Sequence, residues 1–210
     1  STLNTKSLKE EAKQLRLKKR FSQNFLIDAA IINKIVTSLD LSPKDTLVEI
    51  GAGSGFLTQA LIGKPEKLIA IEVENKMVKY LTEKFSLEDP APPFQLIHKD
   101  VMRVDFESFD TPQYKVVGNL PYSITSPILF RLCGELHDNP YPLRQRISQM
   151  TFMVQKEVAE RISAKPGSKA YNALSVCLQY WFDTKMICNV PSHAFTPRHK
   201  VESAESQLTP

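Results

Sequence analysis

A glycine-rich turn between a predicted strand and a predicted helix limits the fold of this chain more than any other feature. The apolar, β-branched stretch 46–50 predicts a strand, residues 51–55 read Gly-Ala-Gly-Ser-Gly, and 56–62 predicts a helix. Glycine lets the backbone turn sharply and lets a ligand approach without a Cβ in the way. In an open α/β sheet such a turn lies at the carboxyl edge, where ligands bind.

The rest of the chain extends this unit into a larger α/β domain. Strand-like and helical stretches alternate along most of the 210 residues, which predicts an α/β protein with a mainly parallel, doubly wound sheet. Helices are expected over 3–20, 28–39, 56–62, 75–85 and 124–133, strands over 46–50, 67–73, 94–98 and 114–118, and further elements over 150–154, 173–182 and 186–190.

Acidic residues near the glycine turn indicate its ligand. Glu72 ends the second predicted strand 21 residues after Gly51, close to the spacing at which a carboxylate holds ribose hydroxyls. The turn is neither a dinucleotide fingerprint, because Phe56 stands where glycine is required, nor a P-loop. With Glu49 two residues before Gly51, it suits a nucleoside without pyrophosphate, which points to S-adenosylmethionine. Asp100, after the third predicted strand, suits the adenine amine. The alternative is an ordinary strand-to-helix turn.

The turn after the fourth predicted strand carries the most specific chemistry, and it reads Asn119-Leu120-Pro121-Tyr122. The Asn119 carboxamide oxygen can accept a hydrogen bond from an exocyclic amine, and an extruded base can stack on Tyr122. Pro121 biases Leu120 toward an extended backbone, which helps aim carbonyl groups outward. Two acceptors can hold the protons of an adenine amine so that its lone pair faces a methyl donor. The alternative is a proline turn with a half-buried tyrosine.

Positive charge is concentrated at the N-terminus. Residues 1–20 carry seven basic and two acidic side chains, +5 in all, and the whole chain is +4, so the other 190 residues sum to −1. A basic arm on a nearly neutral body is typical of proteins that contact a polyanion. A solvated, lysine-rich helix without a partner explains the charge equally well.

Composition excludes several other classes of protein. With 42% hydrophobic and 24% charged residues, the chain is neither disordered nor fibrous. No apolar run approaches the roughly 18–20 residues of a membrane span, and we expect no secretory signal in the polar, lysine-rich first twenty residues. Cys133, Cys177 and Cys188 form no CxxC pair, and the four histidines have no metal-ligand spacing. We therefore expect reduced thiols in a cytosolic protein and assign no metal.

Two further motifs, together with the turns above, resemble those of a known family. Residues 23–26, Gln-Asn-Phe-Leu, are similar to a box that closes over the cofactor, and 194–197, Ala-Phe-Thr-Pro, to a motif whose phenylalanine clamps the target base. From about residue 19 to 200 the chain resembles the KsgA-type small-subunit ribosomal RNA adenine dimethyltransferases, of the rRNA adenine N6-methyltransferase superfamily. The resemblance implies a Rossmann-like class I S-adenosylmethionine-dependent methyltransferase, with a mainly parallel seven-stranded sheet and helices on both faces.

The resemblance also implies roles for individual residues. It makes Asn119, Leu120, Pro121, Tyr122 and Phe195 catalytic, with Tyr122 and Phe195 on either side of the adenine. The cofactor-binding residues that it implies are Gln23, Asn24, Leu26, Glu49, Gly51, Gly53, Glu72, Asp100 and Asn119. The late motif departs from the family, which continues Pro-Lys-Val-Asp-Ser-Ala-Val-Val where this chain has His199-Lys-Val-Glu202-Ser-Ala-Glu205-Ser.

The function implied is dimethylation of two adjacent adenosines near the 3′ end of small-subunit rRNA, with a role in ribosome biogenesis. The expected partner is that rRNA or the immature small subunit, and the chain is expected to be a cytoplasmic monomer that binds no membrane. One alternative is a large-subunit rRNA methyltransferase of the erythromycin-resistance type. Another is a non-catalytic RNA-binding or transcription factor, which would not need an intact catalytic turn. A small-molecule methyltransferase would not need the basic arm.

Three parts are expected along the chain. Residues 1–20 form the basic arm and residues 21–200 the catalytic domain. Because the family carries a small helical domain after the late motif, residues 201–210 are expected to begin such a domain, the rest of which is absent from this sequence.

Overall fold

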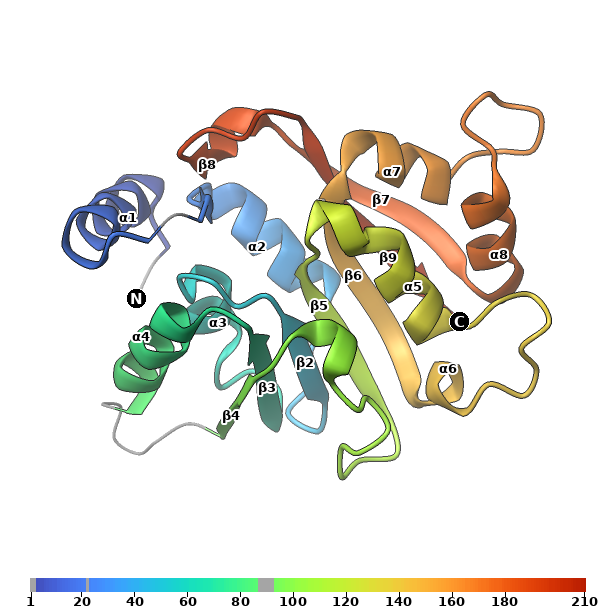
Figure 1. Ribbon diagram of the computed structural model, residues 1–210, viewed down its shortest axis with the longest axis horizontal. Helices are drawn as coiled ribbons and strands as arrows, with labels where there is room; N and C mark the ends of the chain where they lie inside the picture. The colour runs from blue at the N-terminus through green and yellow to red at the C-terminus, as the bar shows by residue number, and fades with distance from the viewer. Residues whose placement is uncertain (1–2, 22, 87–92) are drawn as a thin grey trace.

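A seven-stranded sheet forms the centre of the molecule in the computed structural model, which describes residues 3–21, 23–86 and 93–210 (Figure 1). The strand order is β4-β3-β2-β5-β6-β9-β7. The first five strands are parallel, and β9 is antiparallel to both neighbours. The bounds are β2 Thr46–Ile50, β3 Lys67–Glu72, β4 Phe94–His98, β5 Tyr114–Asn119, β6 Ile147–Gln155, β7 Asp183–Val190 and β9 Ser203–Thr209. The predicted mainly parallel α/β fold is confirmed.

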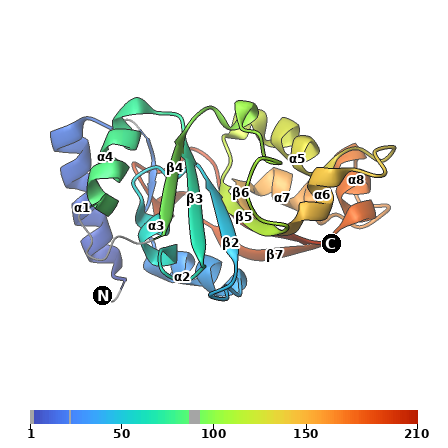
Figure 2. The same ribbon diagram turned by 90° about the horizontal axis from the view of Figure 1, so that it is seen from below.

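Helices cover both faces of this sheet (Figure 2). Every residue of β2 is buried, as expected for a parallel strand covered on both sides. Val48 and Ile50 pack with α5–α8, whereas Leu47 packs with α2 and α3 on the opposite face. The bounds are α2 Ala29–Ser38, α3 Phe56–Leu61, α4 Asn75–Ser86, α5 Thr125–Cys133, α6 Pro142–Arg146, α7 Lys156–Ile162 and α8 Ala173–Trp181. Of the helices described, none combines the length and apolarity that a membrane span needs.

Residues 203–209 correct the expectation that 201–210 begin a helical domain. They form β9, which is hydrogen-bonded to β6 on one side and to the edge strand β7 on the other. Ala204 and Leu208 enter the core formed with α5–α8, and β9 is buried at most positions because it has a strand on each side. Without β9, strand β7 would have no neighbour linking it to β6, so these residues belong to the central sheet.

The basic N-terminal segment is a helix packed on the body. In α1 (Thr5–Lys19), Leu8, Ala12 and Leu15 are buried in a cluster with residues from α2, α3 and α4. The Thr5 hydroxyl accepts a hydrogen bond from the Ala29 backbone N–H at 3.0 Å. One face of α1 is therefore core, while the six basic side chains of α1 and that of Arg20, its C-cap, are exposed.

A separate two-stranded ribbon lies beside the main sheet. It pairs β1 (Phe25–Leu26) antiparallel with β8 (Phe195–Thr196), placing Leu26 opposite Phe195. The ribbon joins the segment after α1 to the segment before β9, two regions about 170 residues apart in the sequence. It thereby brings the predicted motifs at residues 23–26 and 194–197 to the carboxyl edge of the parallel strands.

Candidate active site

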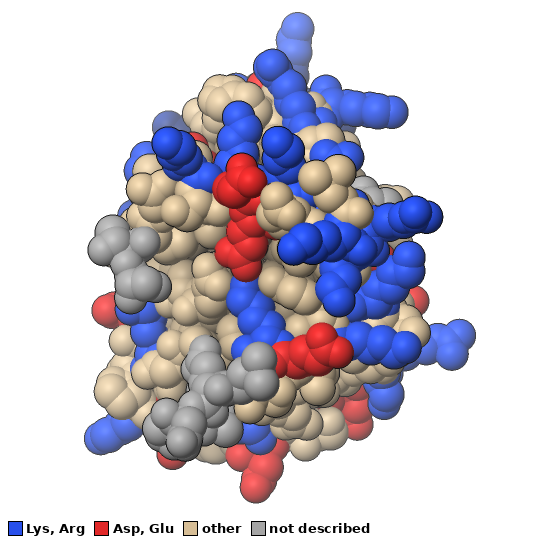
Figure 3. Space-filling model, turned by 90° about the vertical axis from the view of Figure 1, so that its left-hand side faces the viewer, with Lys and Arg blue, Asp and Glu red and all other residues tan. Residues whose placement is uncertain are grey.

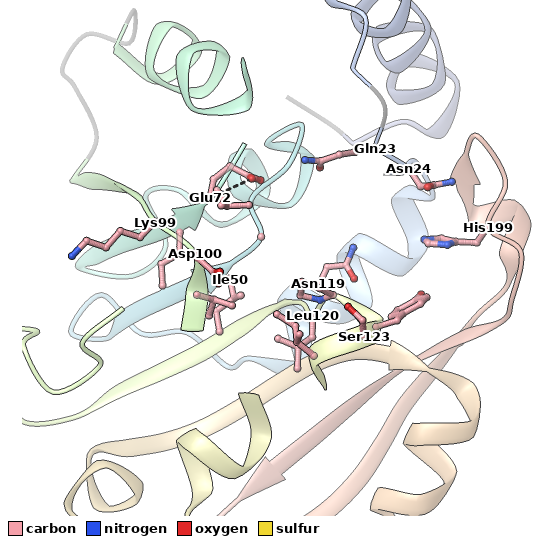
Figure 4. Close-up of a pocket in the computed structure, with 17 residues that line it drawn as sticks. Gln23, Asn24, Ile50, Glu72, Lys99, Asp100, Asn119, Leu120, Ser123 and His199 are labelled. Atoms are coloured by element: carbon pink, nitrogen blue, oxygen red, sulfur yellow. Dashed lines mark hydrogen bonds between the residues drawn. The ribbon is translucent and has the colours of Figure 1, made fainter. Parts of the chain in front are cut away.

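A cleft of about 660 Å³ opens at the carboxyl edge of the parallel strands (Figure 4). Predicted site residues that line it are Gln23, Asn24, Gly51, Glu72, Asp100, Asn119, Leu120, Pro121 and Tyr122. A second cavity of about 70 Å³ is lined by Leu26, Glu49 and Gly53, and it shares Gln23, Asn24, Gly51 and Asn119 with the cleft. The structure thus brings together all the predicted site residues except Phe195, which lines neither cavity.

The glycine turn is shaped by left-handed backbone and by close approach to β5. Gly51 and Gly53 have φ values of +74° and +56°, which side chains other than glycine rarely adopt. A Cβ on Gly51 would lie 2.9 Å from the carbonyl oxygen of Asn119. A Cβ on Gly53 would lie 3.2 Å from Oε1 of Gln23. The two glycines therefore keep open a space that any larger residue would fill.

Glu72 is held at the end of β3 by backbone groups. Its Oε1 accepts from the N–H of Gly53 at 2.9 Å, and its Oε2 accepts from the N–H groups of Val73 and Glu74 at 2.8 and 2.9 Å. The side chain is 5% exposed. Each carboxylate oxygen has two lone pairs, so Glu72 retains acceptor capacity while the turn fixes its orientation.

Asp100 follows β4 and lines another wall of the cleft. It caps the short helix η1 (Val101–Arg103), and its Oδ1 accepts from the Met102 N–H at 2.9 Å. This bond uses one oxygen and leaves acceptor capacity on an exposed carboxylate. Asp100 thus faces the cleft, and its contact with an adenine amine stays a prediction.

The Gln23–Leu26 box is fastened to elements on two sides of the cleft. Gln23 Nε2 donates to Oε2 of Glu74 at 2.5 Å, and Asn24 Nδ2 donates to the carbonyl of Pro197 at 2.6 Å. Gln23 therefore ties the box to the segment after β3, and Asn24 ties it to the segment after β8. Leu26 turns away from the cleft into the smaller cavity.

Glu49 lies beneath the glycine turn, in the smaller cavity. It is 1% exposed and accepts from the Thr58 hydroxyl of α3 at 2.6 Å. Burial raises the pKa of Glu49 to about 7, although the bond from Thr58 opposes that shift. Its carboxyl therefore holds a proton to a higher pH than an ordinary surface glutamate does.

The Asn119–Tyr122 turn lies where β5 leaves the sheet. The Leu120 N–H donates to the carbonyl of Met153 on β6 at 3.3 Å, and the Leu120 side chain is buried. The Pro121 carbonyl accepts from the Thr125 hydroxyl at 3.1 Å. The Tyr122 hydroxyl is hydrogen-bonded to that of Ser203 on β9. Burial raises the pKa of Tyr122, offset in part by Ser203, so the phenol stays neutral and its ring is fixed.

His199, and not Phe195, lines the cleft beside Tyr122. The Phe195 ring is 3% exposed and lies behind His199, with ring centroids 4.1 Å apart and planes at 90°. His199 lines the cleft and faces Tyr122, with centroids 5.5 Å apart and planes at 31°. The signal was present in the sequence, since His199 stands at a departure from the family's late motif. Ser203, which anchors Tyr122, carried no such signal.

Both the fold and the residues around the cleft define a class. A Rossmann-like sheet whose carboxyl edge carries the Glu72 carboxylate and the Asn119–Tyr122 turn is the arrangement of class I methyltransferases, whose ligand binds at that edge.

The comparisons with known proteins define the family. A model of the family described as ribosomal RNA adenine dimethylase matches residues 14–210, and the chain belongs to that family. A curated relative from Hydrogenovibrio crunogenus, named ribosomal RNA small subunit methyltransferase A, is 42% identical over 92% of this chain and 70% of its own length.

Solved structures agree with this assignment. A dimethyladenosine transferase from Plasmodium falciparum superposes with a TM-score of 0.75 at 28% identity, covering 87% of this chain and 62% of its own. The 23S rRNA methyltransferase ErmE has a TM-score of 0.71 at 26% identity, covering 88% and 69%. The chain therefore spans somewhat under two thirds of the Plasmodium enzyme.

Proposed function

We propose that this chain transfers methyl groups from S-adenosylmethionine to the exocyclic amines of two adjacent adenosines near the 3′ end of small-subunit rRNA. One observation carries the proposal: Glu72 and the Asn119–Tyr122 turn line a single cleft (Figure 4). A nucleoside held by the first and an adenine held by the second would meet there. The name of the Hydrogenovibrio relative supports the small subunit as substrate.

The residues on the nucleoside side fit the cofactor. Glu72 would hold the ribose hydroxyls and Asp100 the adenine amine, because both are carboxylates with remaining acceptor capacity. The space kept by Gly51 and Gly53 would take the part of the ligand nearest the backbone. When bound, S-adenosylmethionine supplies an electrophilic methyl group on a sulfonium. Side chains and backbone groups of this chain would hold the two substrates in place.

The turn after β5 would prepare the acceptor amine. The amine of adenine is a poor nucleophile because its lone pair is delocalised into the ring. The Asn119 carboxamide oxygen and a backbone carbonyl of the turn would accept its two protons, which turns the lone pair toward the methyl donor. Tyr122 would hold the extruded base by stacking, worth about 1–3 kcal/mol. Extrusion is needed because the amine is out of reach in a stacked duplex.

Basic side chains beside the cleft would bind the RNA backbone. Lys and Arg residues gather on the side of the molecule that carries α1 and α4 (Figure 3). Exposed cations here are Lys6, Lys9, Lys13, Arg16, Lys18, Lys19 and Arg20 near α1, and Lys76 and Lys79 on α4. A hollow between α1 and β8 is lined by Lys13, Arg16, Arg20 and Thr196. Because β8 leads directly to His199 at the cleft, phosphates bound in this hollow would lie near the base site.

We extend the proposal to the natural setting of the reaction. The substrate would be the immature small subunit, the enzyme a monomer acting in the cytoplasm, and the modification a step of ribosome biogenesis. Shared fold with a 23S rRNA methyltransferase keeps the large subunit as the nearest alternative. The Asn119–Tyr122 turn has the unmodified sequence of the family. A factor that binds RNA without methylating it would not need this turn, so its presence argues against such a factor.

Transfer of label from S-adenosylmethionine to purified ribosomal subunits tests the proposal. Small and large subunits from cells that lack the modification are incubated separately with the enzyme, and calorimetry compares binding of S-adenosylmethionine with NAD. We expect label in small-subunit rRNA alone and no comparable binding of NAD. Label confined to large-subunit rRNA would support the erythromycin-resistance type. Cofactor binding without transfer to either subunit would support a non-catalytic factor.

A further inference from the structure

Glu205 is a buried carboxyl that lacks a partner. It lies in β9, is 2% exposed, and its Oε2 has no hydrogen-bond partner within the part of the chain that the structure describes. The ion pairs of the described residues do not include it. Burying an acceptor without a partner destabilises a fold. The family motif quoted above has valine at this position, so the fold itself does not need a carboxyl here.

The side chain of Glu205 reaches the small cavity beneath the glycine turn, which it lines together with Gly51, Gly53 and Asn119. Met153 of β6 pairs with Glu205 on one side and with Asn119 on the other, so the three residues form one row across neighbouring strands. Residues directly opposite each other in a sheet point to the same face, and Met153 packs on the face that α2 covers. The carboxyl therefore faces the cavity and not the core formed with α5–α8.

Three other polar side chains of this cavity already have partners. Glu49 accepts from the Thr58 hydroxyl, and the amides of Gln23 and Asn24 donate to groups outside the cavity. Glu205 differs from them in lacking a donor. Burial raises its pKa well above 4.5, and a cation beside a carboxyl favours the charged form. A ligand that supplies a cationic donor would therefore satisfy this group.

The size and position of the cavity restrict the ligand. Its volume is about 70 Å³, and a water molecule takes about 30 Å³ of liquid, so the cavity has room for a group of about two non-hydrogen atoms. A nucleoside is too large for it. The cavity shares four lining residues with the cleft, so it lies next to the expected cofactor. The amino-acid end of S-adenosylmethionine carries a primary ammonium, which has three N–H donors as lysine has.

We propose that Glu205 binds the primary ammonium of the cofactor's amino-acid end, a charge-assisted contact that valine at this position could not make. This inference rests on the proposed function, whose cofactor it concerns. The ammonium would enter past Gly51 and Asn119 and donate to Oε2 of Glu205. The cofactor's own carboxylate would stay on the cleft side, because two carboxylates in one small cavity disfavour each other. The contact would pair a carboxyl that the enzyme without ligand buries alone.

Calorimetry with two ligands that differ only in the amine tests the proposal. S-adenosylhomocysteine, the demethylated product of the cofactor, carries the ammonium, and its deaminated analogue has hydrogen in that place. We expect Glu205→Val to weaken binding of S-adenosylhomocysteine about 10- to 150-fold, the range for a charge-assisted bond. Its affinity for the deaminated analogue should stay within about twofold of wild type. Glu205→Gln, which keeps the shape and removes the charge, should also weaken binding of S-adenosylhomocysteine.

Ser206→Ala is the matched control for these variants. Ser206 is the next residue of β9, and its buried hydroxyl also lacks a partner among the described residues. It lies opposite Phe152, which packs in the core on the other face of the sheet. The substitution therefore alters β9 without changing the cavity, and it should leave the affinity for both ligands as in wild type.

The outcomes separate this inference from the proposed function. Equal weakening of both ligands by Glu205→Val would make Glu205 a structural residue, and unchanged affinity for S-adenosylhomocysteine would place the ammonium elsewhere. Either result overturns the inference. So does a Glu205→Gln variant that binds S-adenosylhomocysteine as tightly as wild type, because charge would then play no part. If wild-type enzyme binds neither ligand, the cofactor assigned in the proposed function is wrong, and this inference falls with it.

Discussion

Replacing Glu205 with valine should raise the free energy of unfolding at neutral pH. Glu205 lies in β9, is 2% exposed, and its Oε2 has no hydrogen-bond partner among the described residues. Burying a polar atom without a partner costs about 1–3 kcal/mol. Valine is the residue that the family motif has at this position, and it suits a buried strand. We therefore expect Glu205→Val to add about 1–3 kcal/mol.

The gain should depend on pH in a defined direction. Burial raises the pKa of Glu205 well above 4.5, so above pH 4.5 the unfolded chain releases a proton that the folded chain keeps. Stability contributed by this residue then falls by about 1.4 kcal/mol per pH unit until the folded pKa is reached. The difference between Glu205→Val and wild type should therefore grow from pH 5 upward.

Urea denaturation at pH 5, 6, 7 and 8 measures both effects. Glu205→Gln is the matched control, because it removes the ionisation but keeps a polar group of the same shape. It should remove the pH-dependent part and keep the cost of a buried polar group. The reasoning is refuted if Glu205→Val is less stable than wild type at every pH and both lose stability in parallel.

Three other substitutions follow from the geometry. Gly118→Ala should prevent folding, or lower the free energy of unfolding measured in urea by more than about 3 kcal/mol, because its Cβ would lie 2.2 Å from the Ile50 carbonyl oxygen. A melting temperature equal to that of wild type would contradict this expectation. Glu72→Ala should weaken S-adenosylmethionine binding about 10- to 150-fold in calorimetry, by loss of charge-assisted bonds, and unchanged affinity would place the ribose elsewhere. Lys13→Gln with Arg16→Gln should lower the slope of log affinity against log salt by about 1.4–1.8, and an unchanged slope would mean a solvated helix.

The N-terminal segment illustrates what charge alone predicts and what it does not. Its excess of basic residues indicated an arm for RNA, and the structure does expose all seven. Charge could not show that Leu8, Ala12 and Leu15 pack into the body. Truncation would therefore remove core as well as charge, which is why neutralising substitutions on the exposed face are the better test.

The site was largely predictable because its chemistry is local in sequence. A glycine turn, a strand-end carboxylate and the Asn119–Tyr122 turn each follow a parallel strand, and parallel strands end at one edge. β9 was missed because Glu205 and Ser206 are polar residues at buried positions, which breaks the alternation that marks a strand. His199 was missed because its position at the cleft follows the pairing of β8 with β1, a contact between distant segments.

Mapping of methylated adenosines by mass spectrometry tests the central claim most directly. Small-subunit rRNA is analysed after reaction with wild-type enzyme and with Asn119→Ala, and RNA affinity is measured in parallel. The account predicts dimethylation of two adjacent adenosines near the 3′ end by wild type. It predicts a rate lower by orders of magnitude for Asn119→Ala at similar RNA affinity, because phosphate contacts supply most of the binding. Full dimethylation by Asn119→Ala would show that this carboxamide does not orient the amine, and would contradict the account.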